Sequence, residues 1–313
     1  MINVNASPRI QRLKDDKLRQ RRELSFERAA LYTDSHKKTE GLPSILRRAH
    51  ATAHILKNVK IAVKEDELIV GDRTIKPRSG IASPEMDPYW IMEELDSIEN
   101  RPQDQFYVSE EDKKFFREEL YPYWENRSLK DFVNSKMPEG VKESIQDGVV
   151  KINQTDKGQG HIIPKFEKIL DKGLDALIEQ INTSRQTDPD HSFLQAASIT
   201  LEALQAYILR YAQEANKEAE KEENRQRREE LLKIESVCRK IAHDKPESFY
   251  ESIQLFWFVN LALQYESNAS SISSGRFDQY MISFYRKSLS DGEDKEFLHE
   301  LLRCLWLKMN DVV

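Results

Sequence analysis

The amino-acid sequence predicts a mainly α-helical protein with short strands. Glycine and proline are scarce, at 10 and 11 of 313 residues, whereas Lys, Glu, Leu and Arg are plentiful, which favours long helices. A helical pattern runs almost without interruption from His191 to Ile241. Strand-like patterns are brief. With 39% hydrophobic residues, the chain is long enough to bury one large core or two smaller ones.

The N-terminal part is expected to form a helical layer. Helices are predicted over residues 9–23, 26–33 and 44–56. Ser25 is a suitable N-cap for the second, and Pro43 suits the first turn of the third. Along that third helix, Ile45, Ala49 and Ile55 are placed to share a buried face.

A change of period follows the helical layer. Ile61 and Val63 alternate with polar residues, Glu65 and Asp66 offer a turn, and residues 68–70 form a second apolar run, which together predict a hairpin. Residues 72–87 contain proline and glycine but show no period, so they are expected to form a long irregular connection. Long ordered connections often carry function.

Helices are predicted to resume at Asp87, where Pro88 suits the first turn, and at Ser109, where Asp112 completes a weak capping box. A strand-like run at 149–153, a polar loop at 154–160 and a helix at 164–180 are expected next.

The C-terminal part is expected to be helical. Residues 215–230 are almost all charged or amide residues of alternating sign, which predicts a solvated protrusion or an antiparallel helix pair. Residues 249–263 are apolar nearly all round, which predicts an internal helix. A serine-rich segment, 266–275, follows it.

Charge and hydropathy exclude several classes of protein. The 48 Lys and Arg residues and 54 Asp and Glu residues are interspersed, with a net charge of −6, which argues against nucleic acid as a main partner. Residues 1–24 lack the apolar core of a signal peptide, and the apolar stretch 255–263 is too short to span a membrane. We therefore expect a cytoplasmic protein.

No metal site or disulfide is expected. Cys238 and Cys304 lie in helical patterns without a CxxC spacing, so reduced and buried thiols are predicted. His50 and His54 are spaced to share a helix face, but no acidic residue beside them completes a metal motif. The adjacent basic pair, residues 47–48, would also disfavour a cation.

Two segments carry residues suited to chemistry. His161 follows Gly158-Gln159-Gly160 before a predicted helix, where it either acts as a general acid or base or merely hydrogen-bonds its own loop. The serine-rich segment after the internal helix offers the hydroxyl and amide groups that a polyol or small-anion pocket needs, although a simple turn has a similar composition. Neither segment contains a P-loop or a GxSxG motif.

Nine segments, in order along most of the chain, resemble glycyl radical enzymes of the glycerol dehydratase and pyruvate formate-lyase superfamily. They are Lys37–Gly41, Ile45–Ala49, Asp66–Gly71, Pro77–Ser79, Gly160–His161, Lys168–Leu170, Ser248–Phe258, Glu266–Asn268 and Gly275–Tyr280. The resemblance implies that residues 1–313 are the N-terminal portion of the ten-stranded α/β barrel of this superfamily, a partial pyruvate formate-lyase domain.

The resemblance also implies that no catalytic residue lies in this chain. The family carries a thiyl-forming cysteine and a radical-storing glycine on two central loops, and both are expected beyond Val313. Cys304 matches a helical position of the family. No cofactor is expected to bind this chain. The full-length protein is expected to carry a glycyl radical, installed by an iron-sulfur, S-adenosylmethionine-dependent activating enzyme, and to form a homodimer.

Substrate binding is assigned through the resemblance to His161 and Ser271, which match a histidine and a serine that bind substrate hydroxyls in the dehydratases. Ser270 and Asn153 are added as neighbouring candidates. The glycerol dehydratase pattern has Gly-His where this chain has Ala269-Ser270. The expected pocket therefore differs from one for glycerol.

A second departure is Ser83, which precedes Pro84 where the family pattern has an aromatic residue. A changed pocket would admit another small C2 or C3 substrate, including a sulfonate such as isethionate. Lys157 and Gln159, close to His161 in sequence, would then hold the anion.

The resemblance implies a B12-independent glycerol or diol dehydratase that cleaves a C–O bond of a small hydroxylated substrate. The alternatives are an isethionate-type C–S lyase, a pyruvate formate-lyase (formate C-acetyltransferase) acting with coenzyme A, and, in another class, a non-catalytic helical scaffold or decayed gene fragment. The 313-residue chain alone is expected to be inactive and, because strand edges and internal helix faces would lack partners, prone to aggregation.

Overall fold

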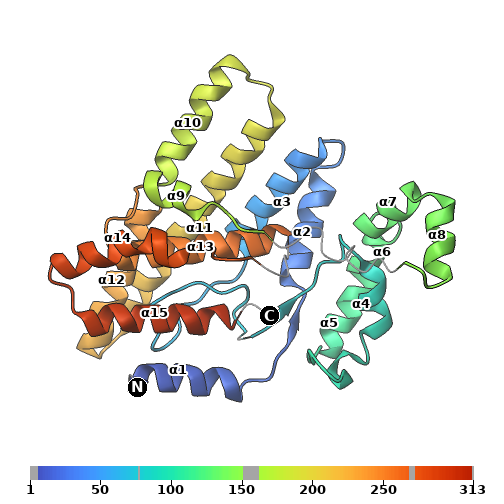
Figure 1. Ribbon diagram of the computed structural model, residues 1–313. Helices are drawn as coiled ribbons and strands as arrows, with labels where there is room; N and C mark the ends of the chain where they lie inside the picture. Colours follow the sequence, from blue (N-terminus) through green and yellow to red (C-terminus); the bar gives the residue numbers. More distant parts are fainter. Residues whose placement is uncertain (1–5, 77, 151–161, 268–271, 312–313) are drawn as a thin grey trace.

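The computed structural model describes residues 6–76, 78–150, 162–267 and 272–311. It is mainly helical, as predicted. A body of long helices surrounds helix α13 (Phe249–Ser267), and a smaller lobe, residues 88–146, lies to one side (Figure 1). The mainly helical class is thus confirmed.

The N-terminal elements are α1 (Pro8–Arg19), β1 (Leu24–Ser25), α2 (Glu27–Lys38) and α3 (Ser44–Asn58). The predicted helices exist, but two details were wrong. Ser25 lies in β1, so Phe26 occupies the N-cap position of α2. Ile45 is 39% exposed rather than buried, because it lies in the first turn of α3, at the surface; Ala49 and Ile55 are buried as predicted.

The hairpin predicted at residues 61–70 does not form. A turn occurs at Glu65 and Asp66, but the flanking residues pair with no strand among the described residues. The physical reason is that side chains of α13 take the backbone groups a partner strand would use. Gln254 bonds both the N–H and the carbonyl of Val70, at 2.9 and 2.8 Å.

Two further side chains of α13 continue this pattern. The Tyr250 hydroxyl donates to the Leu68 carbonyl at 2.5 Å, and Trp257 Nε1 donates to the Gly71 carbonyl at 2.8 Å. The segment 67–74 is buried throughout, so each of these polar backbone groups needs a partner. An internal helix with polar side chains at these positions replaces the strand.

The described part of the connection, residues 72–76 and 78–87, is irregular, as predicted, apart from β2 (Gly80–Ile81). Strand β2 pairs in parallel with β1, with Leu24 opposite Gly80. Elsewhere, isolated bridges join Glu23 to Tyr107 and Ile162 to Ile272.

The lobe consists of α4 (Pro88–Glu94), η1 (Ile98–Asn100), α5 (Glu110–Phe115), η2 (Phe116–Leu120), α6 (Tyr121–Trp124), α7 (Leu129–Lys136) and α8 (Glu139–Gln146). Its helix starts are capped as the sequence predicts at Asp87 and Ser109. Val149 and Val150 are exposed and lie in no strand, which contradicts the first part of the predicted run 149–153. The residues after 150 in that run lie outside the described ones.

The helix predicted at 164–180 is two helices, α9 (Phe166–Lys172) and α10 (Leu174–Thr187). Gly173 separates them with φ +76°, and a Cβ there would clash with the backbone of Asp244 and Lys245. A side chain is excluded at this position, so the helix breaks where two backbones meet.

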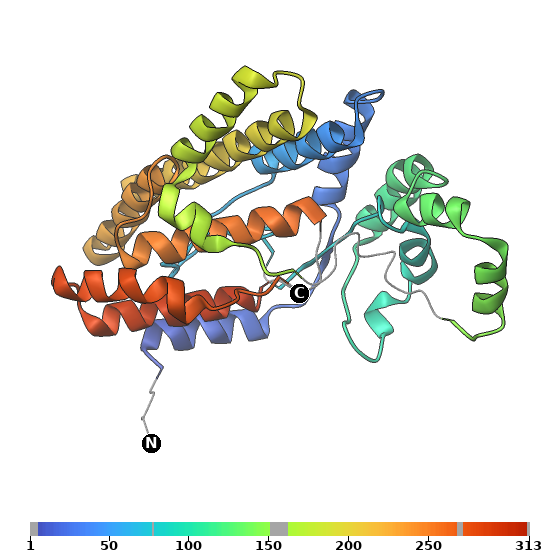
Figure 2. The ribbon, with the colours of Figure 1, turned by 45° about the horizontal axis from the view of Figure 1, so that its top comes forward.

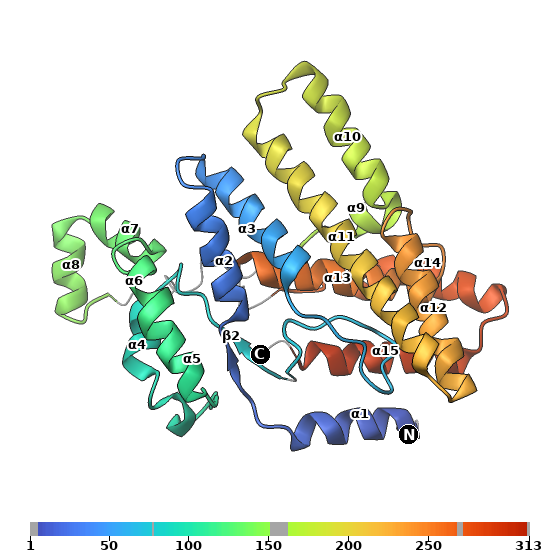
Figure 3. The ribbon, with the colours of Figure 1, turned by 180° about the vertical axis from the view of Figure 1, so that it is seen from behind.

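The stretch 191–241 forms α11 (Ser192–Lys221) and α12 (Arg225–Ile241), joined by a short turn. They fold back on each other as an antiparallel pair, one of the two alternatives that the sequence allowed (Figure 3). The chain then continues through α13, α14 (Phe277–Ser290) and α15 (Lys295–Met309).

Helix α13 is the centre of the body, as its all-round hydrophobicity predicts. It contacts α3, α9, α11, α12, α14 and α15. Figure 2 shows it crossing the middle of the body, with α15 and α1 on one side and the α11–α12 pair on the other. The expected buried, free thiols are confirmed for Cys238 and Cys304.

Helices α14 and α15 leave an apolar groove of about 700 Å³ at the surface. Trp306 is 74% exposed beside it, and Leu302 and Ile282 are partly exposed. The tendency to aggregate stays a prediction.

None of the described helices combines the length and apolar character needed to cross a membrane. Within the same described residues, no group of three or more His, Cys, Asp or Glu side chains could hold a metal ion. His54 contacts Asp34 at 2.9 Å, which gives it a structural partner.

Candidate functional site

The candidate site lies where α13 ends, directly before the serine-rich segment. Arg28, on the buried face of α2, holds this end. Its Nε donates to the Tyr265 carbonyl at 2.8 Å, and Nη2 donates to the Glu266 carbonyl at 3.4 Å. Carbonyls at a helix C-terminus lack intrahelical donors and carry partial negative charge, so a guanidinium is a suitable partner.

The same guanidinium binds the irregular connection. Arg28 Nη1 lies 2.6 Å from Glu85 Oε1 and 3.4 Å from Ser83 Oγ. The Arg28 side chain is fully buried and that of Glu85 is 5% exposed. A buried charge is tolerated when a paired charge and hydrogen bonds compensate for lost hydration. Arg28 therefore ties three segments, α2, the connection and the end of α13, at one point.

A second arginine holds Glu266 by its side chain. Arg48 of α3 forms an ion pair with the Glu266 carboxylate. Both residues also line an otherwise mainly apolar groove of about 650 Å³ between α3, α9, α10 and α11. The end of α13 therefore borders this groove through Glu266.

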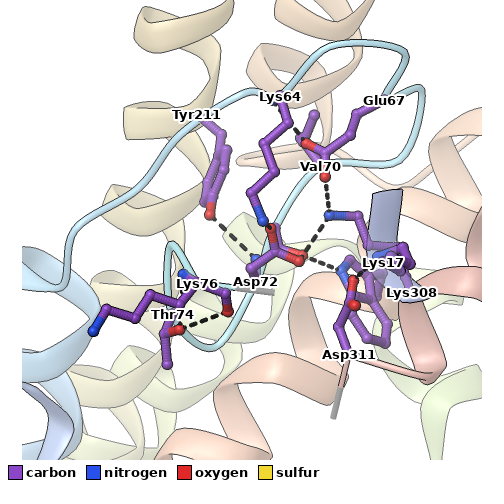
Figure 4. Close-up of polar contacts among 12 residues, drawn as sticks. Lys17, Lys64, Glu67, Val70, Asp72, Thr74, Lys76, Tyr211, Lys308 and Asp311 are labelled. Carbon is purple, nitrogen blue, oxygen red and sulfur yellow. Dashed lines mark hydrogen bonds and ion pairs between the residues drawn. The ribbon is translucent and has the colours of Figure 1, made fainter. Parts of the chain in front are cut away.

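The connection itself is anchored by buried charges around Asp72 (Figure 4). Its carboxylate lies 2.8 Å from Lys308 Nζ, at the end of α15, and 2.7 Å from Lys64 Nζ. Glu67 contacts the same Lys308 ammonium at 2.5 Å. The two lysines and two carboxylates balance in charge, so this cluster holds the connection between α13 and α15.

Protonation in this cluster follows from burial and pairing. Burial by itself raises the pKa of Asp72, but the charges of Lys308 and Lys64 outweigh it, and the net pKa is lowered. Burial likewise opposes the charge of Lys308, but Asp72 and Glu67 outweigh it and raise the pKa above its usual value. Asp72 and Lys308 therefore stay charged near neutral pH.

The Asp72 backbone is fixed from α11 and α13. The Tyr265 hydroxyl donates to the Asp72 carbonyl at 2.8 Å, and the Asp72 N–H donates to the Tyr211 hydroxyl at 3.4 Å. Burial raises the pKa of both tyrosines well above the usual value, which keeps the hydroxyls protonated. The cluster thus connects back to the residue whose carbonyl Arg28 holds.

A parallel bridge joins two segments that lie far apart in sequence. Ile162 pairs with Ile272, and the Ser273 N–H donates to the Ile162 carbonyl at 2.9 Å. These residues directly follow the glycine-flanked histidine segment and the first part of the serine-rich segment. The two segments that the sequence singled out are therefore brought together where they enter the described structure.

The comparisons with known proteins decide the family. The family described as PFL-like, pyruvate formate lyase-like, matches residues 4–313. The chain belongs to this pyruvate formate lyase-like family. The predicted family is thereby confirmed, and the nine matching segments were a sufficient signal for it.

Three relatives of this PFL-like chain are informative. The structure of the B12-independent glycerol dehydratase from Clostridium butyricum, in its glycerol-bound form, is 37% identical with a TM-score of 0.93 and covers 99% of this chain. A glycyl radical enzyme from Archaeoglobus fulgidus is 37% identical with a TM-score of 0.90, over 97% of the chain. The (2S)-3-sulfopropanediol dehydratase of Klebsiella oxytoca is 33% identical over 97% of the chain.

The PFL-like chain spans about two fifths of the length of these relatives: 41% and 40% of the two structures and 38% of the Klebsiella protein. The fold prediction is confirmed in this sense: the described helices match part of a glycyl radical enzyme fold.

The residues predicted to bind substrate lie outside the described ones. This holds for Asn153, His161, Ser270 and Ser271, and also for the proposed anion ligands Lys157 and Gln159. Their assignment stays a prediction. The described structure supplies the ends of the segments that carry them.

Sequence reasoning missed Arg28 and Glu85. A signal for Arg28 existed, because it shares the buried face of α2 with Tyr32, at a spacing of four residues. A charged residue on an apolar face needs a buried partner. Glu85 had no comparable signal, since it lies in a segment without periodicity.

Proposed function

We propose that the full-length protein is a glycyl radical lyase of the dehydratase type, which cleaves a C–O bond of a small hydroxylated substrate. In this proposal the present chain supplies one wall of the substrate chamber, with His161, Ser270, Ser271 and Asn153 as hydrogen-bonding groups. The observation that carries it is the Ile162–Ile272 bridge, which supports a common location for the two candidate segments.

The family relationship supports the reaction class. A relative with a TM-score of 0.93 is named as a glycerol dehydratase in its glycerol-bound form. When installed, a glycyl radical would supply hydrogen-atom abstraction through a cysteine. By the resemblance, the radical-storing glycine and this cysteine belong to sequence beyond Val313, and a radical S-adenosylmethionine enzyme installs the radical. A homodimer in the cytoplasm is part of the same proposal.

This chain's own residues would orient the substrate and handle a proton. The imidazole of His161 would bond one hydroxyl and move a proton as water leaves, while the Ser271 hydroxyl would fix the second oxygen. Ser270 stands where the glycerol dehydratase pattern has histidine, so it would bond a hydroxyl with a smaller group and leave more room.

The test uses full-length protein activated anaerobically. We expect a glycyl radical signal by electron paramagnetic resonance, oxygen-dependent cleavage at a C-terminal glycine, and aldehyde formation from 1,2-propanediol or glycerol. His161→Ala and Ser271→Ala should each lower kcat/KM by about a hundredfold at unchanged radical content. His243→Ala, an exposed histidine paired with Asp175, is the control. An uncleaved, oxygen-insensitive protein would overturn the proposal.

A second candidate is favoured by one observation, the similarity to a dehydratase named for a sulfonated diol. In this version the substrate carries a sulfonate, which Lys157 and Gln159 would bind. An isethionate-type C–S lyase would release sulfite, whereas a dehydratase would not. Assaying sulfite and aldehyde from isethionate and from a sulfonated diol separates the two. The charge-neutral variant Lys157→Gln should raise KM only for the sulfonates.

A further inference from the structure

We propose that Arg28 is a positioning residue for the substrate wall: it fixes the carbonyl end of α13, from which the serine-rich segment departs. The inference deepens the proposed function and rests on it. Arg28 acts through the chain's backbone and is not itself expected to touch the substrate.

The contacts of Arg28 are concentrated on this end. Nε and Nη2 bond two successive carbonyls, those of Tyr265 and Glu266. Only Ser267 then separates the bonded carbonyls from residue 268, where the serine-rich segment leaves the described structure. The guanidinium also lies 4.8 Å from the centre of the Tyr32 ring, which limits its own motion.

The charged partner of Arg28 is Glu85, which lies two residues after Ser83, the second position at which the chain departs from the family pattern. Glu85 and Ser83 bond the same Nη1 atom, at 2.6 and 3.4 Å. Among the described residues, the other carboxylate oxygen of Glu85 is buried without a hydrogen-bond partner. The connection and the end of α13 are therefore set relative to each other by one guanidinium. A shift of either segment moves the other.

A planar guanidinium with fixed donors suits this role, whereas an ammonium does not. Lysine at position 28 would keep the positive charge but could not bond Tyr265, Glu266 and Glu85 in the same geometry. Displacements of about 1 Å in a group that orients substrate cost up to about a hundredfold in rate. Arg28→Lys is thus expected to alter substrate selection while the fold is retained.

The chain offers a matched control. Arg210 of α11 also bonds carbonyls at a helix end, with Nη1 2.7 Å from the Leu56 oxygen and Nη2 2.6 Å from the Val59 oxygen at the end of α3. It performs the same chemistry away from the serine-rich segment. Arg210→Lys therefore reports the general cost of losing such a bond.

The experiment compares wild type, Arg28→Lys and Arg210→Lys as full-length, activated protein. Radical content is measured first, and then kcat and KM for the (R) and (S) enantiomers of 1,2-propanediol. We expect Arg28→Lys to keep its radical, to raise KM about tenfold and to reduce discrimination between the enantiomers about tenfold. Arg210→Lys should change neither quantity by more than about twofold.

Glu85→Gln serves as a second variant in case Arg28→Lys does not fold. It keeps an acceptor for Nη1 but removes the charge, so a smaller change in the same direction is expected. Unchanged KM and enantiomer ratio in a radical-bearing Arg28 or Glu85 variant would overturn the inference. A wild type that forms no radical and converts neither enantiomer would instead count against the proposed function.

Discussion

The lobe and the inner layer of the body satisfy their backbone groups in opposite ways. In the lobe, residues 88–146, the caps are local: Ser109 and Ser128 each accept the N–H of the residue three positions later. In the inner layer, which we define as residues 67–74 with α13 and Lys308, the partners are remote. Gln254 and Val70 are 184 residues apart in sequence.

This difference has consequences for stability. A local cap can fail alone, since its loss frays one helix end. In the inner layer, the buried segment 67–74 receives hydrogen bonds from four side chains, those of Tyr250, Gln254, Trp257 and Lys308. If one of these side chains is lost, its polar partners stay buried, with neither a hydrogen bond nor a water molecule to replace it. We expect a single substitution in the inner layer to lower the free energy of unfolding more than one in the lobe, and to raise hydrogen exchange over a longer stretch of the chain.

The largest effect is expected for Lys308→Met. It removes the ammonium that pairs with the buried carboxylates of Glu67 and Asp72, so that among the described residues Asp72 keeps its ion pair with Lys64 and Glu67 keeps none; this loss costs about 3–5 kcal/mol. Native-state hydrogen exchange of full-length protein, measured by mass spectrometry over residues 64–74, reports the loss. Lys287→Met, which breaks an exposed pair with Asp291, should have no measurable effect on the same exchange.

The pH dependence sharpens this prediction. The lowered pKa of Asp72 means that its stabilisation is present above the usual value of 3.8 and is lost as the pH falls through the lowered value. The raised pKa of Lys308 means that its contribution is lost only as the pH rises beyond the usual 10.5. A cost that varied strongly between about pH 5 and 9 would contradict the assignment.

Gln254→Leu should have the next largest effect. It leaves the N–H and carbonyl of Val70 buried without their partners, at about 1–3 kcal/mol for each group before relaxation. Exchange should accelerate across residues 67–71 as a unit. Gln195→Leu, which loses one exposed bond to the Pro189 carbonyl, is the control. Equal exchange in both variants would mean that the inner layer is not cooperative.

Two helix starts of the lobe were predictable because their signals are local. Each start is predicted by residues within one turn of it, namely Asp87 with Pro88 and Ser109 with Asp112. The structure has both caps. The internal character of α13 was predictable for a similar reason, since a helix that is hydrophobic on every face is stable in water only when other elements cover it.

The inner layer was not predictable because its partners are remote. The pattern of Ile61, Val63 and Leu68 favours a hairpin, and only the positions of Tyr250, Gln254 and Trp257 on a distant helix decide otherwise. Lys308 gave a weak signal, since it follows Leu301, Cys304 and Leu305 on the buried face of α15. Its two acidic partners lie more than two hundred residues away.

The candidate site was predicted only through the family resemblance. Composition and spacing singled out the segments around His161 and Ser271 without selecting a role for them. The buried face of α2 gave a signal for Arg28, but that signal does not identify its partners, which are two carbonyls and a carboxylate from other segments. Residues that act by holding backbone are the hardest to find from sequence.

A smaller effect, limited to one helix, is expected in the lobe for Ser128→Ala. Ser128 forms a capping box with Asp131 at the start of α7, and loss of such a cap costs about 1 kcal/mol. Faster hydrogen exchange should be confined to residues 129–133. Ser135→Ala, within the same helix, removes only an exposed bond to the Phe132 carbonyl and should have no measurable effect. Exchange that spread into the body would contradict a local cap.

The smallest effect is expected where the lobe meets helix α2 of the body. His36 of α2 lies against Trp124 of the lobe, with ring centres 5.2 Å apart, and the Trp124 indole donates to Thr33 Oγ1 at 2.8 Å. Burial, together with the charges of Arg47 and Arg28, lowers the pKa of His36 to about 4. The imidazole is therefore neutral in the folded protein at pH values where an unfolded chain has begun to protonate it.

Because the unfolded state binds the proton more strongly, the contribution of His36 to stability is complete above its usual pKa of 6.5 and decreases as the pH falls toward about 4. Exchange at residues 121–125, corrected for intrinsic rates, should rise across this window in wild type. His36→Gln should flatten the dependence, while His243→Gln, an exposed histidine, should not. If exchange in the wild type did not change between pH 6.5 and about 4, protonation of His36 would not affect the contact between lobe and body, which would then depend on the bond between Trp124 and Thr33.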